Sequence, residues 1–198
     1  NIEKQQVYID QNIRDMAIQY RDLFSNLAQA LIAENKKNKA REVLDKCEQL
    51  FPNSRIPYEY FSIKIANNYA AIGDSEKANT IYMQIMNSTS NNFLYYMSVR
   101  PNKKSYIYND VMQDINIATE LFEIANNAGN KVFAKSIASS TSAFFEQYFS
   151  FTHQVSLCKP EQFEQYNSWV FQLTGDLPYI AYWYNAMKVF IMSNNTEI

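Results

Sequence analysis

Apolar residues recur at three- and four-residue steps over most of the chain, a pattern typical of amphipathic helices. The first segment starts at Asp10 and carries Ile13, Met16, Ala17, Tyr20, Phe24, Leu27, Ala28 and Leu31. After the polar stretch ENKKN at 34–38, the same period continues through Ala40, Val43, Leu44, Cys47, Leu50 and Phe51. Because Pro52 cannot continue a helix, the pattern predicts a helical hairpin over about 10–52.

The same arrangement returns further along the chain and predicts hairpins at about 57–88 and 103–149. Three segments share one spacing: Asn35 to Ala40, Gly73 to Ala78, and Gly129 to Ala134. We therefore expect three copies of one turn. Prolines at 160 and 178 suit the first turn of a helix, so we expect capping helices over about 160–194 that close the stack.

Hairpins with a period close to 34 residues are typical of helix–turn–helix solenoids. The first hairpin resembles the tetratricopeptide repeat at Phe24, Leu27, Ala28, Leu31, Ala40, Leu44, Cys47 and Pro52. The second fits through Ile65, Ala66, Tyr69, Gly73, Ala78, Tyr82 and Ile85. The third resembles the repeat loosely, since Phe122 stands where a small residue is expected. The resemblance implies one all-α domain over 1–198, a tetratricopeptide-like right-handed α-solenoid.

Composition agrees with this fold and excludes several functions. Three glycines and five prolines are few for the many turns of an all-β protein. The net charge is −2 and the lysines are spread over several segments, so the sequence lacks the basic patch that is typical of nucleic-acid-binding proteins. The most apolar segment, 179–192, is shorter than the roughly 20 residues of a spanning helix and is interrupted by Asn185 and Lys188. We expect a soluble domain that does not itself cross a membrane.

No set of residues suggests catalysis, a metal or a cofactor. The one histidine, His153, has no second histidine or cysteine pair near it, and no phosphate-binding loop is present. Cys47 lies on an apolar stripe and is expected to be a buried thiol, although the sequence leaves open a disulfide with Cys158. The aromatic groups at 95–108 and 169–184 suit core packing better than a sugar site. We expect no enzyme activity from this chain.

Candidate binding residues follow from the repeat. In tetratricopeptide proteins the first helix of each hairpin faces a concave groove, and that resemblance places Ser25, Gln29, Tyr60, Ile63, Asn67 and Ala71 inward. Of these, Tyr60, Ile63, Asn67 and Gln29 are the predicted contacts for a protein, peptide or glycan. Ile63 and Ala71 occupy positions where some relatives carry a lysine that holds a peptide carboxylate, so that mode of binding is not expected.

A second resemblance rests on the order of several phrases along the chain. These are YRDLFSNLAQALIAENKKNKAREVLDKCEQLFP, PYEYFSIKIANNYAAIGDSEKANTIY, NFLYYMSV and DVMQDINIATELFEIANNAGNKVFAKSI. Over about residues 9–149, the chain resembles the soluble C-terminal region of a Bacteroidetes family of multi-pass membrane proteins of unknown function. The membrane part of that family is similar to protein O-mannosyltransferases.

The second resemblance implies a non-catalytic, periplasmic tail of a glycosyltransferase-like membrane protein, with any transferase site elsewhere in the parent chain. A start at Asn1 without an initiator methionine fits a piece of such a chain. The alternative is a stand-alone peptide-binding scaffold or adaptor, and an enzyme is a distant third reading. Ten or so hydrophobic helices upstream in the reading frame would favour the tail over the scaffold.

Overall fold

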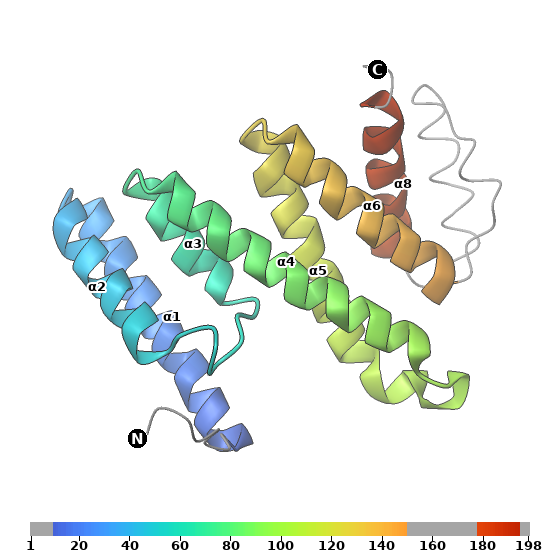
Figure 1. Ribbon diagram of the computed structural model, residues 1–198, viewed down its shortest axis with the longest axis horizontal. Coiled ribbons are helices and arrows are strands. Elements are labelled where there is room, and N and C mark those ends of the chain that lie inside the picture. Colours follow the sequence, from blue (N-terminus) through green and yellow to red (C-terminus); the bar gives the residue numbers. More distant parts are fainter. Residues whose placement is uncertain (1–9, 150–177, 195–198) are drawn as a thin grey trace. The chain divides into compact units, whose positions relative to one another are not determined.

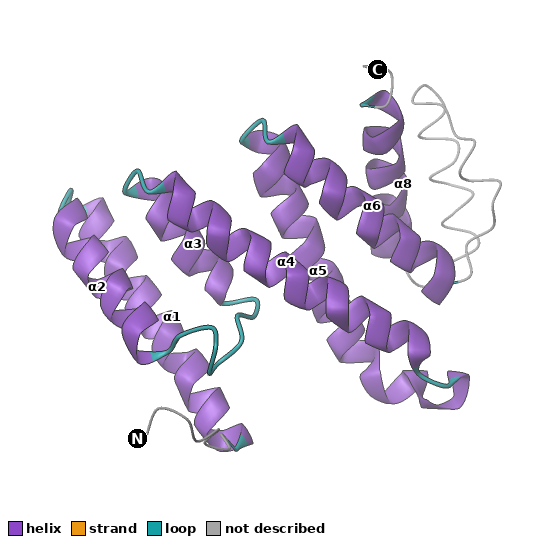
Figure 2. Cartoon of the chain, viewed as in Figure 1, coloured by secondary structure: helices purple, strands orange, loops and turns teal. Residues whose placement is uncertain are grey.

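The structure, a computed structural model, describes residues 10–149 and 178–194. Every regular element in these residues is a helix, and no strand occurs among them (Figure 2). The helices are α1 (Gln11–Ala33), α2 (Lys37–Leu50), α3 (Ser62–Ala71), α4 (Ser75–Ser98), the 3₁₀ helix η2 (Pro101–Ile107), α5 (Tyr108–Asn127), α6 (Lys131–Tyr148) and α8 (Pro178–Ser193). The all-α prediction is confirmed.

The chain divides into two compact units, residues 1–88 and 89–198, and α4 begins in the first and ends in the second. In the first unit α1 packs along α2 and against α3 (Figure 1). In the second unit α6 packs against both α5 and α8. That the whole chain acts as one domain remains a prediction.

Three hairpin turns share one backbone geometry. The second residue after the first helix of each hairpin has a left-handed φ: 60° at Asn35, 95° at Gly73 and 69° at Gly129. In each turn the next residue donates its N–H to the carbonyl five residues back, at 2.8–2.9 Å. Five residues after each of these positions lies a fully buried alanine: Ala40, Ala78 and Ala134. This bonding closes a helix end, and it confirms the predicted repetition of one turn.

The buried face of α1 differs from the expected one. Of the eight apolar residues expected there, Ala17 and Ala28 are buried, whereas Ile13, Met16, Tyr20 and Leu27 are about half exposed. Arg21 and Ser25 are buried in their place. The apolar arc of α1 is wider than α2 and α3 cover, so apolar spacing alone misplaced its centre.

Arg21 stabilises the connection between α2 and α3 by hydrogen bonds. Its guanidinium donates to the carbonyls of Phe51 at 2.7 Å, Ile56 at 2.5 Å and Pro57 at 3.0 Å, and it lies 4.9 Å from the ring centre of Tyr58. These bonds satisfy carbonyls that no helix satisfies. Burial lowers the pKa of Arg21.

Helix α4 extends beyond its expected end near residue 88, through the polar stretch NSTSNN. In the second unit, Asn92 and Tyr96 donate to the carboxylate of Asp114 on α5, at 2.9 and 2.6 Å. Phe93 stacks on Phe144 of α6 with ring centres 4.2 Å apart. These contacts stabilise a segment whose own helix propensity is low, so the predicted break was wrong.

Helix α8 covers part of the second unit's core and begins at Pro178, as the sequence predicts. Phe122, where the repeat favours a small residue, packs edge-on against Phe190 of α8 with ring centres 5.1 Å apart. Tyr184 donates to Glu146 of α6 at 3.1 Å. The helix expected from residue 160, together with His153 and Cys158, lies outside the described residues.

Candidate functional site

Polar contacts join the first helices of the two hairpins in the first unit. The amide nitrogen of Asn68 on α3 donates to the carbonyl of Ser25 at 2.8 Å and to its hydroxyl oxygen at 3.0 Å. Nearby, Lys64 pairs with Asp22 of α1 at 2.7 Å. Ser25, expected in the groove, is instead buried in this contact, because α3 packs directly on it. The hydrogen bond from Lys64 lowers the pKa of the Asp22 carboxyl.

Exposed residues follow one another at four- and three-residue steps along the start of the second hairpin: Tyr60, two residues before α3, and then Lys64, Asn67 and Ala71 on α3. Ile63 is 1% exposed and lies in the core. The expectation that Ile63 faces a groove is therefore wrong, because one step along a helix turns a side chain by about 100°. Lys64 was missed, although its spacing from Tyr60 and Asn67 could have found it.

On α1 the exposed polar side includes Asn26 and Gln29. We call Asn26, Gln29, Tyr60, Lys64, Asn67 and Ala71 together the first-helix surface. The amide nitrogen of Asn26 donates to Asp22 at 3.1 Å, which leaves its carbonyl oxygen available. The carbonyl of Asn67 accepts the hydroxyl of Tyr82, which leaves its amide N–H groups available. The surface thus offers donors and acceptors beside an aromatic ring, Tyr60, that is 39% exposed.

Two kinds of chemically reactive group can be placed in the described residues, namely candidate metal ligands and the thiol of Cys47. No three histidine, cysteine, aspartate or glutamate side chains there lie close enough to hold a metal ion. Cys47 is a fully buried free thiol, as expected, and burial raises its pKa to about 12. A thiol with this pKa is protonated at neutral pH and a poor nucleophile. Within 10–149 and 178–194, no helix combines the length and apolar content that crossing a bilayer requires.

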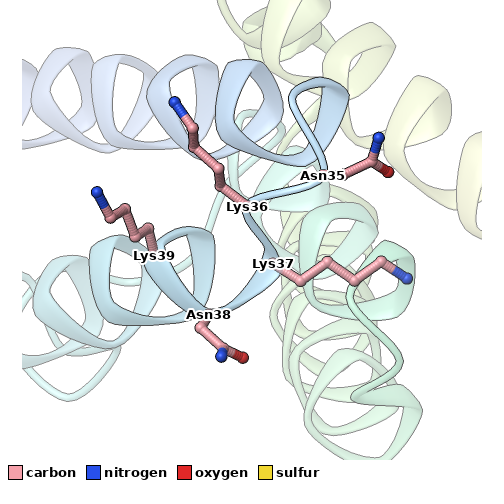
Figure 3. Close-up of a pocket in the computed structure, with 5 residues that line it drawn as sticks. All are labelled: Asn35, Lys36, Lys37, Asn38 and Lys39. Carbon is pink, nitrogen blue, oxygen red and sulfur yellow. The ribbon is translucent and has the colours of Figure 1, made fainter.

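A hollow of about 360 Å³ lies at the turn between α1 and α2 and is lined by Asn35, Lys36, Lys37, Asn38 and Lys39. Figure 3 shows that its lysine side chains diverge, with Lys37 pointing away from Lys36 and Lys39. Lys36 also pairs with Glu34. Because the ammonium groups do not converge, the hollow is not an anion site.

Comparison with known proteins gives one match that agrees with this geometry. The family model of the tetratricopeptide repeat matches residues 22–54, which run from within α1 to just past α2. No curated protein and no solved structure matches the chain. With its helical hairpins and repeated turn, the chain has an all-α, tetratricopeptide-like helical repeat fold. The resemblance to the Bacteroidetes membrane proteins stays a prediction.

Proposed function

We propose that this chain is a non-catalytic interaction domain that binds a protein or glycan partner through the first-helix surface. Tetratricopeptide repeats generally mediate protein–protein interaction, and their stacked hairpins offer extended surfaces. The observation that carries the proposal is the row of exposed amides on adjacent first helices. Asn26, Gln29 and Asn67 supply both donors and acceptors, the pairing that a peptide backbone or a sugar hydroxyl needs.

We further propose that the domain is the periplasmic tail of a glycosyltransferase-like membrane protein and influences which partner or acceptor reaches the membrane part. The order of phrases over residues 9–149 supports this reading. The tetratricopeptide match supports equally a stand-alone peptide-binding scaffold. The gene's full reading frame distinguishes them, since about ten hydrophobic helices upstream would support the tail. Weak contacts spread over such a surface can select an acceptor without touching a reaction centre.

The binding surface is tested by selecting ligands and then removing the surface. A random peptide library and a glycan array are screened against the chain, and the affinity of the best ligand is measured by calorimetry. The triple variant Gln29→Ala, Tyr60→Ala and Asn67→Ala should bind it at least tenfold more weakly. Loss of the Asn67–Tyr82 hydrogen bond costs about 1 kcal/mol of stability, so the variant should remain folded.

A matched control removes exposed side chains elsewhere in the first unit. Asn38→Ala, Asn79→Ala and Met83→Ala delete two amides and one large side chain outside the first-helix surface. This control should keep full affinity. Equal affinity of the surface triple and the wild type would overturn the binding assignment. Sugar transfer by the isolated chain, from an activated donor to an acceptor peptide, would overturn the non-catalytic assignment.

A further inference from the structure

A regular row of large apolar side chains on α1 is exposed. Ile13, Met16, Tyr20, Leu23 and Leu27 are 50, 54, 47, 61 and 51% exposed, respectively. Their steps are three, four, three and four residues. Alternating three- and four-residue steps form the narrow seam by which one helix packs lengthwise on another. We call these five residues the α1 seam.

The α1 seam borders a second row on α2. Lys39, Val43, Lys46 and Leu50 are separated by four, three and four residues and so share one face of that helix. The opposite side of α2 is occupied, because Arg41 pairs with Asp74 and Asp45 pairs with Lys77 of α4.

A hollow of about 330 Å³ joins the two rows. Its lining includes Ile13, Met16 and Tyr20 from α1, together with Leu50, Phe51 and Arg55. Its lining is mostly apolar, with Arg55 as the one cation, and Lys39 and Lys46 lie further along the α2 row that ends at Leu50.

The shape of this groove suits a helix better than an extended peptide. Side chains of an extended peptide repeat every two residues, whereas the seam repeats every 3.5, the period of a partner helix in a lengthwise contact. Together with Leu50, the seam presents roughly 600 Å² of half-exposed side chain, near the 800 Å² that each partner contributes to a standard interface.

The charges specify the partner further. Lys39, Lys46 and Arg55 belong to none of the ion pairs found in the described residues, and one carboxylate, Glu42, lies beside their row. The outer flank of the seam carries Asn12, Asp15, Gln19, Asp22 and Asn26. Asp22 pairs with Lys64, so the described part of a second copy of this chain would bring Asp15 as the one carboxylate of its flank outside an ion pair, together with the same three cations. A helix with several carboxylates along one flank complements the three cations better than a second copy does.

We propose that the groove between the α1 seam and the Lys39–Leu50 row of α2 binds an amphipathic helix of a partner protein. That helix has apolar residues at three- and four-residue steps and carboxylates along one flank. The apolar residues pack on the seam, and the carboxylates lie against Lys39, Lys46 and Arg55. This surface is distinct from the first-helix surface, and the two can be tested separately.

The test uses the full chain and two fluorescein-labelled peptides of three heptads, each with leucine at the first and fourth positions. One carries glutamate at the fifth and seventh positions and the other lysine, and binding is followed by anisotropy at nanomolar peptide. We expect the acidic peptide to bind at least tenfold more tightly than the basic one. The double variant Met16→Glu and Leu23→Glu should abolish binding of both peptides. The double variant Lys39→Ala and Lys46→Ala should bind the acidic and the basic peptide equally.

Two controls distinguish this groove from general adhesion and from self-association. Met83→Glu changes a side chain on α4 that is 54% exposed, as Met16 is, and should leave binding unchanged. All variants are first shown to keep the wild-type circular dichroism and melting temperature. The proposal is overturned if the two peptides bind equally, if neither binds, or if Met83→Glu is as damaging as the seam variant. It is also overturned if sedimentation shows a dimer of the chain that the seam variant dissociates.

Discussion

Replacing Arg21 should destabilise the first unit strongly although no helix residue loses a backbone hydrogen bond. In the folded chain Arg21 is 1% exposed, and its guanidinium donates to three carbonyls between Phe51 and Pro57. Arg21→Met removes the donors but fills similar space. The three carbonyls then stay buried without partners, unless the connection opens to water and releases the packing of Ile56 and Tyr58, which are both buried.

The expected magnitude follows from these contacts. Removing one partner of a buried charged interaction costs about 3–5 kcal/mol. Burying a methionine in its place returns about 1 kcal/mol of hydrophobic free energy. We therefore expect a loss of about 3 kcal/mol, which is a shift of about 1.5 M in the urea midpoint at a typical slope near 2 kcal/mol/M. Arg21→Lys keeps a charge but has a single nitrogen donor, so it should lose about half as much.

The assay must report on the first unit alone. Both tryptophans lie beyond residue 89, whereas Cys47 is buried in the first unit and becomes reactive when that unit opens. Pulsed thiol labelling of Cys47 across a urea series therefore gives the midpoint. Arg14→Met, one heptad earlier on α1 and only partly buried, is the matched control and should shift little. Equal midpoints for Arg21→Met and wild type, or an equal shift for Arg14→Met, would refute the reasoning.

Three further outcomes are expected. In native buffer, Cys47 should react with a thiol reagent far more slowly than in urea, because burial raises its pKa to about 12. Rapid labelling of the native chain would place Cys47 at the surface. Ala78→Leu should lower the free energy of unfolding by about 1–3 kcal/mol, because it overpacks the hairpin. Asn79→Leu, on the exposed side of α4, should lower it by at most about 0.5 kcal/mol. Equal urea midpoints for the two variants would contradict the hairpin register. Burial raises the pKa of Asp114 above its unfolded value, so folding favours the protonated carboxyl and the stability it contributes is lost as pH rises through the folded pKa. Asp114→Asn should therefore flatten the loss of second-unit stability as pH rises above the unfolded pKa of an aspartate, about 4. Tryptophan fluorescence in urea measures this stability, and an unchanged slope would exclude Asp114 as the source of the loss.

The hairpins and their turns were predictable because their causes are local. Helix periodicity, a glycine or asparagine suited to positive φ, and a small residue five positions later all lie within one stretch of sequence. The burial of Arg21 was not predictable in this way. Its partners lie 30–36 residues further along the chain, and apolar spacing gives no signal for a buried cation.

The same distinction explains the length of α4 and the composition of the first-helix surface. The polar stretch at 87–92 predicts the end of a helix, yet Asn92 donates a hydrogen bond to Asp114, which is 22 residues away. For the surface, the repeat resemblance correctly indicated exposed positions at Gln29, Tyr60 and Asn67, but placed Ile63 outward. Whether the surface binds a partner depends on a second molecule, which no spacing in this chain describes.

The three matching turns are unequally spaced along the chain. Gly73 follows Asn35 by 38 residues, and Gly129 follows Gly73 by 56, while the bonding at each turn is the same. The longer second interval comes from the helices themselves, since α4 has 24 residues against 14 in α2, and α5 has 20 against 10 in α3. The family match at residues 22–54 covers one such hairpin turn. Helix length therefore differs from hairpin to hairpin, whereas the turn within each hairpin keeps one geometry.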